Sequence, residues 1–271
     1  MPRRAPALHT NLRPTPRELR WFAHIDRHGP QSSEFLIELT KDTHRCKDTA
    51  LRRLQALREA GYLFLPLQQR HIAKADFHPY VYDLTPAGCE CLSYEQELER
   101  HARPTGHWWH GFWVSSVTST IEITATRHAL EYIPAARILA IKGVCMEIPL
   151  RHSSVIPDQL FAIKYADGYR AYALEVDRGT EPLRSRAARK SLQRSVQQYR
   201  DVLDQKLHRQ QFGLKSNLWV LWTFASIARE RQWHELLQSH CAQHKSGVVS
   251  QHFPAFTDVA GLASDQLDIR P

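Results

Sequence analysis

The sequence predicts an α/β chain of the α+β kind with two domains, a helix-rich domain over residues 1–100 and a mixed-sheet domain over residues 101–271. Helix-start signals and amphipathic patterns dominate the first part of the chain. Two strand-like runs joined by a turn dipeptide, and a later apolar run over residues 218–224, indicate a sheet in the second part. A length of 271 residues fits one large or two ordinary domains.

Three short helices are predicted in the first domain. Thr15-Pro16-Arg17-Glu18 is a capping box with proline at the first helical position, and the helix that it begins should end at Gly29. A second helix is expected from Ser33, and a third over Asp48–Ala60 with Gly61 as its C-cap. Three short helices in this order suggest a helix-turn-helix.

Two strands should follow the third helix, over residues 61–65 and 80–84, with a polar loop between them. Helices followed by such a pair of strands resemble a winged helix-turn-helix module, which implies DNA binding through the third helix and the wing. The candidate DNA-binding residues are Lys47, Arg52, Arg53, Arg58, Arg70 and Lys74. The alternative is a winged helix that makes protein contacts, on which these charges only increase solubility.

Carboxylates gather at the open end of a predicted hairpin over residues 159–176, whose loop is expected at Asp167-Gly168. The register then puts Asp158 opposite Asp177, and the period of two puts Glu175 on the same face. Clustered carboxylates raise one another's pKa and commonly hold a hard divalent cation such as Mg²⁺ or Mn²⁺. From the spacing alone, a hairpin end with solvated acids remains an equal alternative.

This part of the chain resembles the PD-(D/E)xK nuclease fold, a restriction-endonuclease-like domain. The resemblance rests on the order of three features: Pro157-Asp158, then Glu175-Val176-Asp177, then a long basic helix from Pro182. That pattern ends in lysine, whereas position 177 is aspartate. The resemblance implies catalytic roles for Asp158, Glu175, Asp177 and Lys190, in which the three acids bind metal and Lys190, on the helix, supplies the missing cation. A solvated helix lysine is the alternative for Lys190.

The remaining elements complete the predicted second domain. An aromatic helix is expected from about residue 107 to 121, and either Glu122 or Glu131 after it would suit a nuclease metal site. Further strands are predicted over residues 137–141, 144–148 and 218–224, and an amphipathic helix over residues 230–244.

Composition narrows the class of function. The net charge of +8 and the pI of about 9.4 favour a polyanionic partner, for which nucleic acid is the economical choice. No apolar run approaches the roughly 20 residues of a bilayer span. The five cysteines contain no Cys-x-x-Cys, which favours a reducing, bacterial-type cytoplasm. Phosphate-loop, nucleophile-elbow and zinc-protease motifs are absent from the sequence.

The sequence resembles the replication-relaxation family, which includes MobC-type plasmid mobilisation relaxases. The features that carry the resemblance are the winged helix, Asp158, the segment Glu175–Glu181, Lys190 with Tyr199, and the strand over residues 219–224. The resemblance implies a Mg²⁺- or Mn²⁺-dependent endonuclease that nicks one DNA strand at an origin of transfer or replication of a plasmid or integrative element.

The implied partners are double-stranded DNA with a locally melted or nicked site and other mobilisation or replication proteins, without a membrane. The competing class is a non-catalytic DNA-binding accessory or replication-regulatory protein, in which the nuclease-like domain serves as a scaffold.

Overall fold

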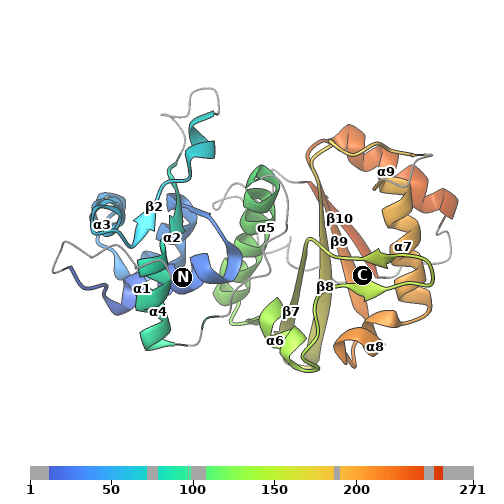
Figure 1. Cartoon of the computed structure of the whole chain (residues 1–271), viewed down its shortest axis with the longest axis horizontal. Helices are drawn as coiled ribbons and strands as arrows, with labels where there is room; N and C mark the ends of the chain where they lie inside the picture. Colours follow the sequence, from blue (N-terminus) through green and yellow to red (C-terminus); the bar gives the residue numbers. More distant parts are fainter. Residues whose placement is uncertain are drawn as a thin grey trace, which may run out of the picture. The chain divides into compact units, whose positions relative to one another are not determined.

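The computed structural model describes residues 12–71, 79–96, 98, 108–185, 190–240 and 247–252. The chain divides into two compact units, Met1–Ile123 (unit 1) and Thr124–Pro271 (unit 2). Helices and strands of both units are labelled in Figure 1. The division falls 23 residues beyond the predicted boundary at residue 100, within the long helix α5.

Unit 1 is built from helices around a small sheet. Its three strands form an antiparallel sheet in the order β1-β3-β2, with Gln31 opposite Tyr82 and Leu63 opposite Leu84. The elements are α1 (Pro16–His28), β1 (Gln31–Ser32), α2 (Ser33–Leu39), η1 (Lys41–Thr43), α3 (Lys47–Glu59), β2 (Leu63–Phe64), η2 (Leu67–His71), β3 (Val81–Leu84), α4 (Pro86–Glu95) and α5 (Trp108–Arg127).

Local signals set the helix ends of unit 1. The amide of Thr15 donates to Glu18 Oε2 at 2.8 Å, so the predicted capping box forms and α1 begins at Pro16 as expected. Glycine at position 88 lets α4 approach β2, because a Cβ there would lie 2.4 Å from the carbonyl oxygen of Tyr62. The core between these elements consists of Trp21, Phe22, Ile25, Leu36, Ala50, Leu54, Leu57, Leu63 and Leu92, with their neighbours.

An ion pair joins α3 to α1 inside unit 1. The carboxylate of Glu18 is fully buried, and Arg53 Nη2 donates to its Oε2 at 3.0 Å while Arg53 Nε donates to Oε1. Burial raises the pKa of Glu18, but the hydrogen bonds from Arg53 and Thr15 outweigh it, so that the pKa lies below its usual value. Arg53, predicted to contact DNA, therefore has a structural partner.

Helix α5 carries an unusual buried face of hydroxyl groups. Ser115 donates to the carbonyl oxygen of Pro30 at 2.7 Å and bonds the side chain of Gln31 at 2.6 Å. Thr118 and Ser119 bond the imidazoles of α1, as described below. Because of these bonds, residues 108–123 of α5 belong to unit 1. The sequence had predicted the whole helix to lie in the second domain.

Unit 2 is a mixed five-stranded sheet with helices. The strand order is β10-β9-β8-β7-β4, in which β8, β9 and β10 are parallel and β7 is antiparallel to both of its neighbours. Figure 1 shows α7, α8 and α9 on one face of this sheet. The elements are β4 (Glu131–Pro134), α6 (Ala135–Ala140), β5 (Ile148–Pro149), β6 (Ser154–Val155), β7 (Gln159–Tyr165), β8 (Gly168–Asp177), α7 (Leu192–Asp204), α8 (Leu207–Phe212), β9 (Leu218–Phe224), α9 (Ile227–His240) and β10 (Val248–His252).

The β7–β8 hairpin forms with a register shifted by two residues from the predicted one. Tyr165 pairs with Gly168, so the loop is Ala166-Asp167, and Gly168 already belongs to β8. Continuing the register beyond the pair Gln159 and Leu174 places Asp158 beside Glu175 rather than opposite Asp177. A shift of two residues leaves every side chain on its predicted face.

Three other predictions about unit 2 are wrong. The strand expected over residues 137–141 is replaced by helix α6 over residues 135–140, because Ala135, Ala136, Leu139 and Ala140 favour a helix and Pro134 precedes its first residue. Within residues 144–148, only Ile148 belongs to a strand. The helix expected from Pro182 begins at Leu192, with Ser191 as N-cap. The strand over residues 218–224 is confirmed.

None of the helices in the described ranges combines the length and the apolar character that a bilayer span requires.

Replacing Arg53 by alanine should destabilise the protein by on the order of 2 kcal/mol, because the carboxylate of Glu18 would stay buried without its guanidinium partner. Urea unfolding measures this loss. Arg52→Ala is the matched control, since Arg52 is an exposed residue of the same helix, and it should change stability by less than about 0.5 kcal/mol. Equal losses in the two variants would contradict a structural role for Arg53.

Candidate active site

Asp158 is held rigidly where β7 begins. Its amide donates to the carbonyl oxygen of Leu174 at 2.9 Å, and its Oδ2 accepts from the amide of Val176 at 2.7 Å. These two bonds fix both the backbone and the carboxylate of Asp158 against β8. Only 9% of Asp158 is exposed, so the carboxylate is largely removed from water.

Glu175 lies beside Asp158 on β8 and has two side-chain partners in the following segment. Tyr199 of α7 donates its hydroxyl to Glu175 Oε1 at 2.6 Å, and Lys190 Nζ lies 3.3 Å from Oε2. Glu175 is 3% exposed and Tyr199 is 2% exposed. The carboxylate is therefore fixed from two sides by residues that come after it in the chain.

Lys190 precedes α7 instead of lying on it. The N-cap Ser191 accepts from the amide of Arg194, and the amide of Leu192 donates to the carbonyl oxygen of Pro182 at 3.1 Å, which secures the start of the helix. The Lys190 ammonium contacts Glu181 Oε1 at 3.4 Å as well as Glu175. About half of the Lys190 side chain, 49%, remains exposed, so its cation can be reached from solvent.

The electrostatics of this group follow from its burial. Burial, followed by repulsion from Asp158, raises the pKa of Glu175 to about 7, although Lys190 and Tyr199 act in the opposite direction. Attraction to Glu175 is the main cause that raises the pKa of Lys190, and burial raises the pKa of Tyr199. Lys190 and Tyr199 therefore offset only part of the cost of a negative charge on Glu175 beside Asp158, and a cation bound to the two carboxylates would be favoured.

Asp177 makes hydrogen bonds to residues outside this group. Its Oδ2 accepts from Arg229 Nε at 3.0 Å and its Oδ1 accepts from the amide of Gly179 at 2.5 Å. Arg229 Nη2 donates further to the carbonyl oxygen of Glu181 at 2.7 Å. Asp177 is therefore occupied by α9 and by the turn after β8, and the structure joins Asp158, Glu175 and Lys190 without it.

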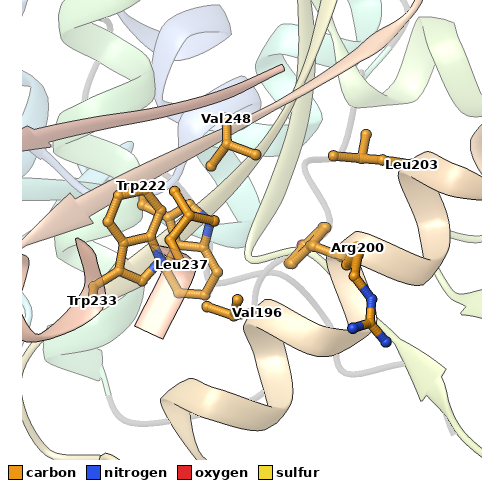
Figure 2. A pocket seen from close by; sticks show the side chains of 8 residues that line it. Val196, Arg200, Leu203, Trp222, Trp233, Leu237 and Val248 are labelled. Atoms are coloured by element: carbon orange, nitrogen blue, oxygen red, sulfur yellow. The ribbon is translucent and has the colours of Figure 1, made fainter. Parts of the chain in front are cut away.

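An apolar pocket between α7 and α9 lies next to the Tyr199 ring (Figure 2). Tyr199 meets Trp222 of β9 edge-on, with ring centroids 6.0 Å apart, and Trp233 of α9 packs on Trp222 at 5.8 Å. The rest of the pocket lining consists of Val196, Arg200, Leu203, Leu237 and Val248. Such packing holds the Tyr199 ring in place so that its hydroxyl reaches Glu175.

The two carboxylates that the sequence left open have other partners among the residues that the structure describes. Glu131 on β4 is exposed and pairs with Arg137 at 2.9 Å and with Lys164 at 3.3 Å. Glu122 bonds to residues of α1 in unit 1. The sequence did not predict the hydrogen bond from Tyr199 to Glu175 or the hydrogen bond from Arg229 to Asp177, because only the tertiary structure brings Tyr199 and Arg229 to β8.

The predicted DNA-binding residues of unit 1 differ in their surroundings. Arg52 on α3 and Arg70 in η2 are exposed, and Arg58 is half-buried in the last turn of α3. Lys47 is exposed and pairs with Glu34 at 3.4 Å. Lys74 lies outside the described residues.

Glu175→Gln should make the protein more stable at about pH 8 while changing little at about pH 5. A raised pKa in the folded state means that the charged carboxylate costs folding free energy, which is absent below the unfolded pKa near 4.5 and complete above about 7. The expected gain at high pH is at most about 3 kcal/mol. Urea unfolding at the two pH values measures it.

The matched control is Glu131→Gln, which removes the same charge from an exposed carboxylate whose pKa is lowered by Arg137 and Lys164. Its effect should be the same at the two pH values, because the carboxylate is ionised at both. A Glu175→Gln variant whose stability relative to the parent does not rise between these pH values would contradict the buried charge.

The comparisons with known proteins agree with the resemblance seen in the sequence. The replication-relaxation family model matches residues 22–218, which reach from α1 to the first residue of β9. No curated protein and no solved structure gives a match. The match spans more than half of the chain, in both units, and the chain therefore belongs to the replication-relaxation family.

Proposed function

We propose that this protein is a metal-dependent endonuclease that nicks one strand of DNA at an origin of replication or transfer. The observation that carries the proposal is the meeting of Asp158, Glu175 and Lys190 at one end of the β7–β8 hairpin. Two buried carboxylates can bind a metal ion, and one accessible ammonium group lies beside them. Together, the metal ion and the ammonium group would stabilise the negative charge that develops on the scissile phosphate. Membership of the replication-relaxation family supports a role in replication or mobilisation.

The arrangement fits a PD-(D/E)xK-like nuclease in which the motif lysine has moved. Asp158 directly precedes β7 and Glu175 lies on the adjacent strand β8, as the two acids of that pattern require, and position 177 holds aspartate where the pattern has lysine. Lys190 brings an ammonium group to Glu175 from the segment after the hairpin. The cation is thus present in space although it is absent from its usual place in the sequence.

Oxygen ligands and a repelling pair of carboxylates are the donor set that Mg²⁺ or Mn²⁺ prefers, so the residues fit such an ion. Asp158 and Glu175 would hold it, and it would supply Lewis-acid stabilisation of charge on the scissile phosphate. In the proposed cleavage a nucleophilic oxygen bonds to phosphorus, the bond to the leaving oxygen breaks, and that oxygen takes up a proton. Lys190 contributes positive charge beside the phosphate, and Tyr199 keeps Glu175 oriented.

We further infer that unit 1 is a winged helix-turn-helix that binds duplex DNA. The order α1, β1, α2, α3, β2, β3 and the small antiparallel sheet agree with such a module. Exposed cations lie on α3 and in the segment between β2 and β3, at Arg52 and Arg70. In this arrangement α3 would enter the major groove, and both Arg52 and Arg70 would contact phosphates at its edges.

Asp158→Asn and Glu175→Gln should each abolish nicking of a supercoiled plasmid that carries the cognate origin, because each removes a metal-binding charge. Lys190→Ala should slow nicking by about 100-fold or more, the scale of losing one preorganised electrostatic contact. Gel separation of supercoiled and open-circular plasmid, with and without Mg²⁺, measures these rates.

Lys164→Ala is the matched control for Lys190, since Lys164 lies on the same hairpin and pairs with exposed Glu131. It should nick at the parental rate. Full activity in the Asp158 or Glu175 variant would refute the site, and a parental rate for Lys190→Ala would remove that residue from catalysis. If the parent itself does not nick its cognate origin, the chain is a non-catalytic DNA-binding protein.

Replacing Arg52 and Arg70 together by alanine should weaken duplex binding and lower the slope of log affinity against log salt by about 2, one for each lost phosphate contact. Fluorescence anisotropy between about 50 and 200 mM salt covers the useful range. Arg53 is left intact because its loss would disturb the fold.

The control for this measurement is Arg137→Ala with Lys164→Ala, which removes the same charge from the exposed Glu131 cluster in unit 2. It should leave the salt slope unchanged. An Arg52 and Arg70 variant with parental affinity and slope would move DNA binding away from α3 and η2.

A further inference from the structure

Two histidines and a glutamate converge inside unit 1, in a place that the proposed nuclease chemistry does not use. His24 and His28 stand one turn apart on α1, and Glu122 comes from α5. One potential ligand atom from each residue lies within 4.8 Å of the other two. The two imidazoles are 1% exposed and the glutamate side chain is 12% exposed.

The outer nitrogen of each imidazole is bound by a hydroxyl group of α5. Ser119 Oγ lies 2.6 Å from His24 Nε2, and Thr118 Oγ1 lies 2.8 Å from His28 Nδ1. Thr118 Oγ1 also lies 3.1 Å from the carbonyl oxygen of Val114, one turn earlier on the same helix. The contact with Thr118 therefore holds the His28 ring in place against α5.

The inner nitrogen of His28 points at a carboxylate. His28 Nε2 contacts Glu122 Oε2, whose other oxygen is paired with Arg27. Without an ion, this nitrogen and the carboxylate share a hydrogen bond, and a metal ion would take the place of its proton. A neutral imidazole whose outer nitrogen is held by a hydrogen bond is the form in which histidine binds a metal ion.

His24 gives an independent sign of the same kind. Its Nδ1 is buried, makes no hydrogen bond with any part of the chain that the structure describes, and lies 3.4 Å from Glu122 Oε2. Two ligand atoms on a tetrahedral ion at about 2.0–2.1 Å would stand about 3.3–3.4 Å apart. This buried imidazole nitrogen thus stands at ligand spacing from a carboxylate.

We propose that His24 Nδ1, His28 Nε2 and Glu122 Oε2 form a binding site for Zn²⁺, with water as the fourth ligand. Nitrogen donors favour zinc or a similar transition metal and disfavour Mg²⁺, which prefers oxygen. Thr118 and Ser119 orient the imidazoles through their outer nitrogens, as the partners of metal-bound histidines do. The ion would join α1 to α5 and stabilise unit 1.

This site does not depend on the proposed nuclease function. Asp158 and Glu175 offer oxygen ligands in unit 2, whereas the histidine site offers two nitrogens in unit 1. Removing either set of ligands should leave the other intact, so each site can fail in experiment without the other.

The test uses the full-length chain after treatment with a chelator. Calorimetric titration with Zn²⁺ should show one ion per chain, and the melting temperature should rise on binding, because the ion binds only the folded site. The double variant His24→Gln with His28→Gln should lose more than about 100-fold in affinity, beyond the about 10–100-fold that losing an outer partner costs.

Two controls isolate the site. His128→Gln removes an exposed histidine just after α5 and should bind Zn²⁺ like the parent, which excludes surface binding. The Asp158→Asn and Glu175→Gln double variant should also keep parental Zn²⁺ affinity even if it cannot nick DNA. Because the histidine variants can lose their fold, X-ray absorption of the Zn²⁺-loaded parent gives a second measure and should show two imidazoles among nitrogen and oxygen ligands.

A stripped parent that binds no stoichiometric Zn²⁺ and gains no thermal stability would overturn the proposal, and the two histidines and Glu122 would then be a buried polar contact between α1 and α5. Parental affinity in the folded histidine double variant, or an absorption spectrum without imidazole ligands, would overturn it equally.

Discussion

The burial of Glu175 beside Asp158 is the constraint on which the candidate active site depends. Two carboxylates that share a site away from water repel each other, and this repulsion adds to the cost of burial. The chain reduces the cost with an ammonium group and a hydroxyl group, from Lys190 and Tyr199. Both come from the segment between β8 and β9, so the start of α7 and its packing on Trp222 decide whether the carboxylates can remain together.

The sequence was sufficient to predict that Asp158 and Glu175 lie close together, because side-chain alternation in a strand tolerates a shift of two residues. The predicted register was wrong by two residues, yet Asp158 and Glu175 kept a common face, since a shift of two restores the alternation. Lys190 was predicted on a helix that in fact begins two residues later, at Leu192. Its place after the hairpin, more than its secondary structure, determines how near it comes to Glu175.

The parts that the sequence could not predict are those that tertiary contacts decide. Arg53 and Arg52 look alike on α3, and only the buried carboxylate of Glu18, 35 residues away in sequence, distinguishes them. Glu122 pairs with residues of α1 that are 94 and 95 positions earlier. Residues 137–141 were predicted as a strand because of their apolar side chains, but Leu139 and Ala140 favour a helix equally well, and a short apolar run does not distinguish a strand from a helix.

The aspartate at position 177 has a consistent physical explanation. Asp177 binds Arg229, Arg229 also binds the carbonyl oxygen of Glu181, and the carboxylate of Glu181 contacts Lys190. A lysine at position 177 would repel Arg229 and release the turn that carries Glu181. The acidic residue therefore helps to place the cation that the nuclease pattern expects at position 177 itself. In the proposed nuclease, the aspartate at position 177 and the approach of Lys190 to Glu175 would be two parts of one arrangement, linked through Arg229 of α9.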